Sequence, residues 1–440
     1  MLFSDITVID ENFNVLPHRY VGVKGDKIAY ISDKKPSDNF GEEYCGKNKL
    51  LIPAFYNAHS HLPMCLMRGY GENLPLMTWL QGRIFPFEKH LTDADIYNGC
   101  MMGITEMLRY GIAATQEMYL SYEPLCQAVI DSGIKAAVSK SCSWMDNTDY
   151  FDLPIFGETV DAIKKYNGAE CGRLKVEFSL HAEYTSTEKI AKGIAEAAAK
   201  YNSSMHVHVA ETKGEVNICR RRHRRRSPVK YLADCGIFDI PAVAAHCVYV
   251  DSADIEILKS HNVSVATCPK SNAKLAGGIC KTSELINAGI NVAIGTDSVA
   301  SNNNLNMIEE MRFFNLLQKA KTLDPTVITS AQTLYAATRA GALAQGRTDS
   351  GFIKEGFKAD IAVLNLDEVY LKPAYNVLDN LIFSASGNDV VLTMADGRVL
   401  YRDGNYPTLD YEKIEYNFEN SRRRILDQVE KAEIAELEKV

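Results

Sequence analysis

The sequence predicts an α/β protein: a (β/α)8 barrel of the TIM type joined to a small β-sandwich domain that both chain ends build. Two observations support this fold class. From about residue 50 to residue 320, short apolar β-type segments alternate with amphipathic helical segments. Before and after that region, strand-like segments and Gly- or Asn-containing turns replace the alternation. A doubly wound open sheet is the competing topology, and both arrangements remain open at this point.

Eight segments of the alternating region are candidate barrel strands, because each is short, apolar and rich in β-branched residues or alanine. Helical patterns separate them, at residues 93–110, 124–132, 188–201, 252–260, 283–288 and 307–319. The candidate strands are Leu51–His59, Ile112–Met118, Ile134–Cys142, Leu174–His181, Ser204–Ala210, Ala242–Val248, Val263–Cys268 and Ile290–Asp297.

The predicted division of the chain follows from these patterns. Residues 1–52 and 350–410 are expected to pair into the small β-domain, because neither part has enough apolar residues for a core of its own. Residues 53–349 form the barrel, and the charged residues 411–440 form a terminal surface helix. The strands expected near the two ends lie at residues 6–9, 20–23, 27–31, 360–366, 376–384, 390–395 and 398–401.

Charge and composition exclude several classes of function. With 48 basic and 56 acidic residues the net charge is −8, which gives no electrostatic reason to expect nucleic acid or an anionic membrane as partner. We expect neither a signal peptide nor a membrane-spanning segment. Eleven cysteines without C-x-x-C spacing indicate reduced thiols and a cytoplasmic protein. The basic run Arg220–Arg226 is interpreted as a solvated helix end, with His223 exposed, rather than as a nucleic-acid patch.

Ligand-type side chains gather where the candidate strands end. The first strand ends in His59 and His61, which point to the same side because side chains two residues apart share a strand face. Later strands end near His181, His208, His246 and Asp297. A barrel places its active site at these carboxyl ends, so the set predicts a single functional centre.

Three imidazoles and one carboxylate form a mononuclear site suited to Zn²⁺, with Fe²⁺ as the alternative. Such a metal lowers the pKa of a bound water to about 7. His206 and His208 share one strand face, and His208 is the predicted ligand because Glu211, three residues later, begins the loop over the metal. Glu211 is predicted to take a proton from the water and pass it to the substrate.

With these residues the chain resembles the amidohydrolase superfamily, and within it the 5′-methylthioadenosine/S-adenosylhomocysteine deaminases. The similar stretches span residues 50–315 and comprise P-A-F-Y-N-A-H-S-H-L-P-M, L-M-R-G-Y-G-E-N-L-P-L-M-T-W-L, I-F-P-F-E, H-V-H-V-A-E-T, A-A-H-C-V and G-T-D-S-V-A-S-N-N-N-L-N-M. The flanking β-segments resemble that family's split β-domain. The metal pattern is shared with guanine deaminases and triazine hydrolases, so it identifies the superfamily more sharply than the substrate.

The resemblance implies a role for each site residue. The metal ligands are His59, His61, His208 and Asp297, holding one ion per subunit; the catalytic residues are Glu211, His246 and Asp297; and the substrate-binding residues are Trp79, Glu88, Lys140, His181 and Glu211. It implies hydrolytic deamination of an adenosine-type nucleoside, most of all 5′-methylthioadenosine, by a homo-oligomer.

One departure from the family concerns substrate choice. Family members bind the carboxylate of homocysteine with arginines after the third strand, where this chain has Lys140 and no arginine before Arg173. Lysine lacks the bidentate fork of arginine, so the sequence favours methylthioadenosine or adenosine over S-adenosylhomocysteine as the substrate. Two alternatives remain open here: a deaminase of guanine or another aminated heterocycle, and a non-catalytic metal- or ligand-binding barrel.

Overall fold

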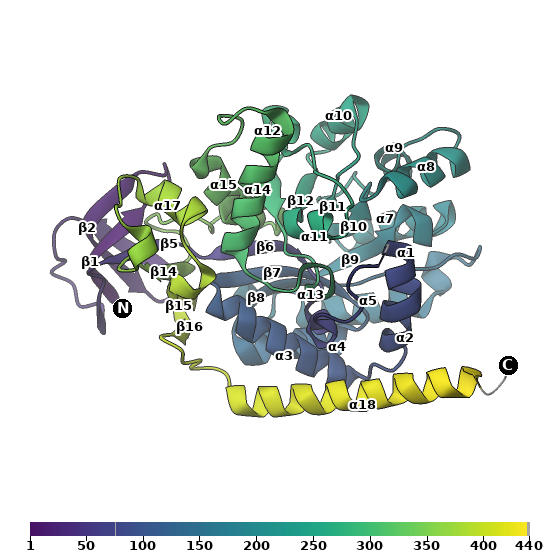
Figure 1. Ribbon diagram of the computed structural model, residues 1–440, viewed down its shortest axis with the longest axis horizontal. Helices are drawn as coiled ribbons and strands as arrows, with labels where there is room; N and C mark the ends of the chain where they lie inside the picture. Colours follow the sequence, from purple (N-terminus) through teal and green to yellow (C-terminus); the bar gives the residue numbers. More distant parts are fainter. Residues whose placement is uncertain (75, 438–440) are drawn as a thin grey trace.

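The centre of the molecule is an eight-stranded parallel barrel with helices outside it (Figure 1). The computed structural model describes residues 1–74 and 76–437. The barrel strands follow one another in chain order around the sheet. They are β6 (Phe55–Ser60), β7 (Ile112–Tyr119), β8 (Lys135–Lys140), β9 (Leu174–Ala182), β10 (Met205–Val209), β11 (Ala242–His246), β12 (Ser264–Thr267) and β13 (Val292–Ile294).

The last strand returns to the first and closes the barrel. The Asp297 amide donates to the His59 carbonyl at 3.0 Å, and Ser60 and Asp297 form a parallel bridge. The predicted barrel is confirmed and the open sheet is excluded. One boundary was wrong: the expected strand Leu51–His59 is two strands, β5 (Lys49–Pro53) and β6, which belong to different sheets.

Helices alternate with the barrel strands along the chain, and most of them pack on the outer face of the barrel. Several of them begin with polar caps; the Thr92 side chain, for example, accepts from the Asp95 amide at the start of α3. In chain order they are α1 (Leu76–Trp79), α2 (Phe85–Glu88), α3 (Asp93–Arg109), α4 (Tyr122–Ser132), α5 (Pro154–Tyr166), α6 (Ala169–Gly172), α7 (Glu188–Lys200), α8 (Lys213–Arg222), α9 (Pro228–Asp234), α10 (Ser252–Ser260), α11 (Pro269–Lys274), α12 (Thr282–Asn287), α13 (Val299–Asn302), α14 (Met307–Thr322), α15 (Ser330–Ala337) and α16 (Arg339–Ala344).

Both chain ends build one mixed sheet at the side of the barrel (Figure 1). It has its own apolar core, which includes Phe3, Val21 and Met394. The segment expected as a strand at 376–384 is instead helix α17 (Val377–Phe383), whose first turn is capped by the Asn376 side chain. The proposed boundaries near residues 52 and 350 remain predictions. The strands are β1 (Leu2–Ile9), β2 (Val15–Lys24), β3 (Lys27–Ser32), β4 (Glu43–Cys45), β5, β14 (Ile361–Asn365), β15 (Val390–Ala395) and β16 (Arg398–Arg402).

A buried ion cluster ties this sheet to the barrel. Lys135, at the start of β8, places its Nζ 2.7 Å from Asp360 Oδ2 and 2.7 Å from Asp396 Oδ1. The Tyr56 hydroxyl also donates to Asp360. Although burial raises the pKa of Asp360, the Lys135 ammonium outweighs that effect and holds it below its usual range. The two sheets therefore share a charged contact in which Lys135 and Asp360 are buried.

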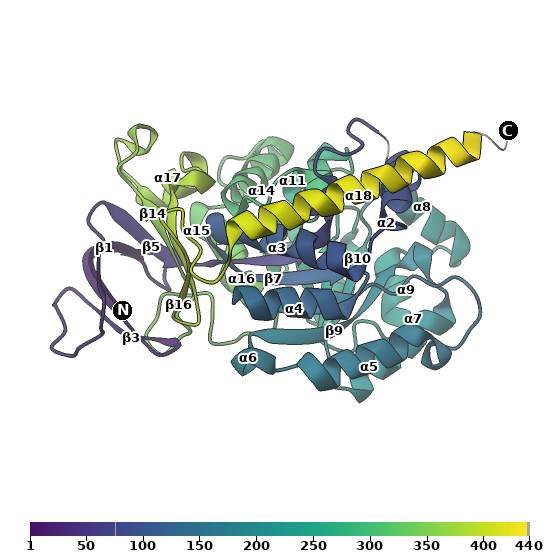
Figure 2. The same cartoon turned by 90° about the horizontal axis from the view of Figure 1, so that it is seen from below.

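The chain ends in the long helix α18 (Tyr411–Leu437), which runs along the outside of the barrel (Figures 1 and 2). The Arg424 guanidinium pairs with Asp95 at the start of α3, and the Asn98 side chain donates to Ser421. The predicted terminal helix is present up to residue 437, and the last three residues lie outside the described part. Among the described helices, none combines the length and apolarity that crossing a membrane requires.

Candidate active site

Four predicted ligands meet at the carboxyl end of the barrel. Asp297 Oδ1 lies 3.3 Å from His61 Nε2 and 3.7 Å from His59 Nε2, and the Nε2 atoms of His61 and His208 are 3.3 Å apart. Tetrahedral zinc with bonds of about 2.0–2.1 Å separates its ligand atoms by about 3.3 Å. The spacing within this cluster therefore fits a single tetrahedral ion.

The outer ring nitrogens orient these imidazoles. His61 Nδ1 donates to the Met118 carbonyl at 2.6 Å and His208 Nδ1 donates to the His181 carbonyl at 2.7 Å, which leaves each Nε2 unprotonated when the ring is neutral. His59 Nδ1 lies 2.9 Å from His206 Nε2, and the buried His59 Nε2 has no hydrogen-bond partner among the described residues. Burial, reinforced by neighbouring imidazoles, holds the pKa of His59 and His208 well below its usual range. Neutral rings with a free Nε2 are what a metal needs, so the residues fit the group.

The position of Asp297 depends on a close approach of two strands. A Cβ at Gly295 would lie 2.8 Å from the Cβ of His59, so only glycine lets β13 end beside the first ligand. Asp297 itself has a φ of 60°, and Ser271 Oγ and the Ser298 amide donate to its carboxylate at 2.6 and 2.8 Å. A strained backbone held by several donors is typical of a functional position.

Glu211 and His246 stand beside this cluster. His246 Nδ1 is 3.0 Å from the Asn272 side-chain oxygen, which directs Nε2 toward the pocket. Burial raises the pKa of Glu211 above its usual range, opposed by His246 and reinforced by Asp297. For His246, burial lowers the pKa but the Glu211 and Asp297 carboxylates outweigh it, so the net shift is upward. The two groups are thus suited to exchanging protons with a bound molecule.

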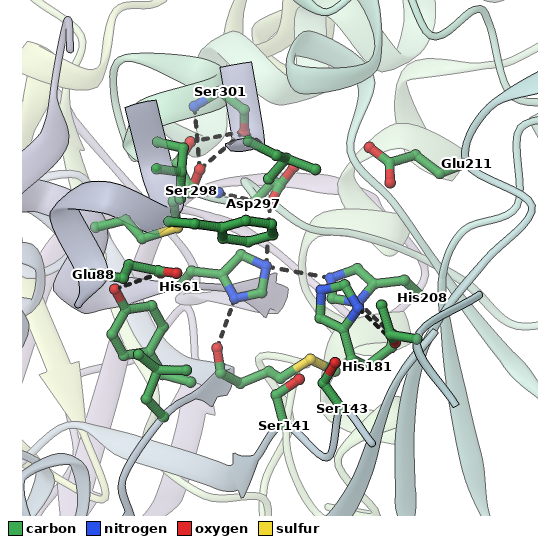
Figure 3. Close-up of a pocket in the computed structure, with 18 of the residues that line it drawn as sticks. His61, Glu88, Ser141, Ser143, His181, His208, Glu211, Asp297, Ser298 and Ser301 are labelled. Carbon is green, nitrogen blue, oxygen red and sulfur yellow. Dashed lines mark hydrogen bonds and ion pairs between the residues drawn. The ribbon is translucent and has the colours of Figure 1, made fainter. Parts of the chain in front are cut away.

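These residues open onto one pocket of about 220 Å³. Figure 3 shows His61 between Asp297 and His208, with Glu88 and Glu211 at opposite sides. The polar lining consists of His61, Glu88, Ser141, Ser143, His181, Tyr184, Thr185, His208, Glu211, His246, Asp297, Ser298 and Ser301; the apolar and aromatic lining consists of Met64, Trp79, Leu80, Ile84, Phe85, Met118, Tyr119, Leu120 and Leu275.

Comparison with known proteins assigns this site to a family. The model of the family described as "Amidohydrolase family" matches residues 50–400, which include every predicted ligand. The chain belongs to the amidohydrolase family. The predictions of an amidohydrolase barrel, of a metal-dependent enzyme and of an aminohydrolase are therefore confirmed, and the non-catalytic barrel is set aside.

Individual relatives of this amidohydrolase are similar over most of their length. A protein of Pelotomaculum thermopropionicum, called 5-methylthioadenosine/S-adenosylhomocysteine deaminase, is 38% identical over 85% of this chain and 86% of its own. One of the same name from Dictyoglomus thermophilum is 35% identical over 95% and 97%. A zinc-bound crystal structure, described as an adenosine deaminase from Xanthomonas campestris, superposes with a TM-score of 0.90 at 28% identity, covering 97% of this chain and 98% of that one.

Four of the five predicted substrate-binding residues line the pocket of the amidohydrolase: Glu211, described above, and Trp79, Glu88 and His181. Trp79 ends α1 and is buried, and Glu88 ends α2, where its Oε1 accepts from the Tyr119 hydroxyl at 2.9 Å. Burial raises the pKa of Glu88 to about 7, with the Tyr119 hydrogen bond opposing. His181 follows β9, and its Nδ1 lies 3.1 Å from Thr185 Oγ1. The geometry brings these four together, and their contact with a substrate stays a prediction.

Lys140 is placed differently. Its ammonium pairs with Glu158, and it is absent from the pocket lining, where the next residue, Ser141, takes part. The sequence reasoning also missed the side chains that support the site: His206 against His59, Asn272 against His246, and Ser271 against Asp297. Ser271 and Asn272 lie in P-K-S-N, just after the seventh barrel strand. They could have been found by looking for polar residues beyond the ends of the strands, which is how the ligands were found.

The basic run at the end of α8 contacts a residue that directly precedes part of the pocket lining. His223 was expected to be exposed, and this is wrong: its Nε2 lies 2.6 Å from Glu183 Oε1, and its ring stacks on Tyr231 with centroids 3.9 Å apart. Arg222 reaches the same carboxylate at 3.4 Å. Glu183 is fully buried and directly precedes Tyr184 and Thr185, which line the pocket. The end of α8 therefore holds this part of the pocket wall in place.

Replacing Glu183 by Gln is expected to raise KM by about 10-fold, equivalent to about 1.4 kcal/mol, while kcat changes by less than 2-fold. The reason is that the Arg222 and His223 contacts weaken and the wall at Tyr184 loosens, whereas the reacting groups stay in place. Steady-state kinetics measures both constants. Arg221→Ala, at an exposed position of α8, is the control and should leave KM unchanged. An unaltered KM in Glu183→Gln would contradict this role.

Proposed function

We propose that this enzyme hydrolytically deaminates adenosine-type nucleosides, with 5′-methylthioadenosine as the leading substrate. The observation that supports it is the arrangement of two functions in one pocket: a ligand and proton-transfer cluster that includes Glu211, and Glu88 at the side opposite Glu211 (Figure 3), with Trp79 also in the lining. A carboxylate accepts from two ribose hydroxyls, and an indole offers a flat surface for an apolar ring. The names of the relatives agree with this substrate class.

The proposed reaction uses the proton-transfer groups in sequence. Glu211 takes the first proton of the water and donates it to the ring nitrogen beside the amino-bearing carbon, while the oxygen of the water forms a bond to that carbon and the ring C=N double bond becomes a single bond. His246 donates a hydrogen bond to the oxygen as charge develops on it. Asp297 accepts the second proton of the water and delivers it to the amino group. The carbon–nitrogen bond then breaks, giving ammonia and the inosine analogue.

His59, His61, His208 and Asp297 would hold the metal, which we propose is Zn²⁺, one ion per subunit, with Fe²⁺ as the alternative. A zinc ion there supplies a Lewis acid that lowers the pKa of water to about 7. The imidazole-rich donor set suits either metal. The zinc in the similar Xanthomonas structure supports the first choice.

Ammonia release from methylthioadenosine, adenosine and guanine tests the proposal. We expect turnover of the two nucleosides and at least 100-fold lower kcat/KM for guanine, because guanine lacks the ribose that Glu88 would bind. Dialysis against a chelator should abolish activity, and Zn²⁺ or Fe²⁺ added back separately identifies the metal that restores it. Guanine as the preferred substrate would contradict the assigned ribose contacts.

We also propose a cytoplasmic location and a homo-oligomeric assembly. The first is supported by the cysteines, which are free thiols in all eleven cases and are exposed only at Cys45 and Cys171 among the described residues. The second has the support of the family resemblance alone. Fractionation of the source cells and light scattering on the purified protein test them.

A further inference from the structure

Apart from the histidines, the charged side chains that line the pocket are all acidic. Three carboxylates line it, those of Glu88, Glu211 and Asp297, and none of the described lining residues is a lysine or an arginine. Asp297 would be neutralised by a metal, whereas Glu88 lies at the side of His61 away from Glu211 (Figure 3). A bound anion would meet no cationic side chain on that side.

Three of the four cations that adjoin the lining in the sequence are engaged elsewhere, and the fourth, Lys89, is exposed. Lys140, which precedes Ser141, pairs with Glu158. Lys274, which precedes Leu275, lies 2.9 Å from a Glu72 carboxylate oxygen. The Arg83 guanidinium, beside Ile84, lies over the Tyr70 ring at 5.9 Å from its centroid. Turning any of these three into the pocket would break an existing contact.

Large apolar side chains line the pocket and yet stay accessible. Phe85 is 45% exposed and Leu120 is 39% exposed, although both belong to the lining. Trp144 and Met145 follow the lining residue Ser143 and are 40% and 56% exposed, and the Trp144 amide donates to the Thr185 carbonyl at 2.8 Å. Accessible apolar side chains in a pocket lining, here Phe85 and Leu120, mark a place that an apolar group can cover.

We propose that the pocket selects nucleosides whose 5′ substituent is uncharged and apolar, such as an alkylthio group, and rejects those that carry a carboxylate. This inference rests on the proposed nucleoside deamination. A carboxylate entering the pocket loses hydration and gains no cationic partner, while an alkylthio group removes apolar surface from water. Of the two substrates that the relatives' names join, this chain takes methylthioadenosine and discriminates against S-adenosylhomocysteine.

Comparing kcat/KM for three thioethers separates charge from size. They are methylthioadenosine, 5′-butylthioadenosine and S-adenosylhomocysteine, the last two having side chains of similar length. We expect butylthioadenosine within about 5-fold of methylthioadenosine and S-adenosylhomocysteine about 100-fold lower, because its carboxylate finds no cationic partner and its ammonium must lose hydration as well. Equal rates for the methylthio and homocysteine compounds would overturn the inference, as would equally poor rates for the butylthio and homocysteine compounds.

A gain-of-function variant tests the same point from the protein side. Ser143→Arg supplies a guanidinium at the lining and should raise kcat/KM for S-adenosylhomocysteine about 10-fold relative to methylthioadenosine. Ser143→Gln, which adds bulk without charge, is the matched control and should not shift that ratio. An unchanged ratio in a folded Ser143→Arg enzyme would contradict the inference. No ammonia from any adenosine derivative would instead overturn the proposed function, and this inference with it.

Discussion

Glu211→Gln is expected to lower kcat by about 10³-fold while the metal content of the protein stays unchanged. The amide of the substituted glutamine has the size of the carboxyl group but transfers no proton. The metal should stay bound because Glu211 is not among the residues whose ligand atoms cluster with those of His61. The rate of ammonia release gives kcat, and elemental analysis gives the metal content. Loss of activity with retained metal would separate proton transfer from metal binding, which variants of the ligands themselves cannot do.

Glu256→Gln is the control for this experiment, since Glu256 is exposed on α10 at the outside of the barrel. Its kcat should equal that of the parent enzyme. If Glu211→Gln kept more than a tenth of the parent activity, Glu211 would not be the group that protonates the ring. If the variant lost its metal, the carboxylate would have a structural role that the distances do not indicate.

Lys135→Met is expected to lower the free energy of unfolding by about 3–5 kcal/mol, because it leaves the buried Asp360 carboxylate without its cation. The Lys135 side chain is only 2% exposed, and both partners lie 2.7 Å away. Urea denaturation followed by circular dichroism gives the free energy. The loss should be larger at neutral pH than near pH 4, because without the lysine burial raises the pKa of Asp360, so in the variant this carboxyl takes up a proton near pH 4 and no longer buries a charge.

Lys164→Met provides the comparison for an exposed pair. Lys164 Nζ lies 3.5 Å from Asp161 with both side chains largely in solvent, so its loss should cost less than about 1 kcal/mol. A similar small change in Lys135→Met would show that the buried cluster relaxes to admit water and does not tie the two sheets together.

The sequence was sufficient to predict the barrel and the residues of its centre, for a physical reason. Parallel strands buried on both faces must be apolar along their length, so polar ligands such as His61 and Asp297 stand out where each strand ends. The positions of those ends were accurate to one or two residues for most strands. The rule that polar residues at strand ends form the site uses only neighbouring positions in the chain. Every residue that it identified lies within three residues of its strand.

Features that depend on packing between distant segments were not predictable in this way. The segment at 376–384 has β-type residues, but the Asn376 cap and its position outside the small sheet make it a helix. His223 lies in a run of arginines, and its burial depends on Glu183, forty residues earlier. Lys140 was assigned by position after a strand, whereas the direction of its side chain is set by Glu158 on a helix that sequence does not place.

The division of one apolar run between two sheets has a consequence for protein engineering. Only Ala54 separates the end of β5 from the start of β6, and its amide donates to the Asp360 carbonyl of the small sheet at 3.0 Å while the Phe55 amide donates to Gly111 of the barrel at 2.9 Å. His59 follows five residues after Ala54. A chimera that exchanges the small sheet with that of a relative must therefore keep residues 49–61 as one uninterrupted piece, or it loses the direction in which the first metal ligands enter the pocket.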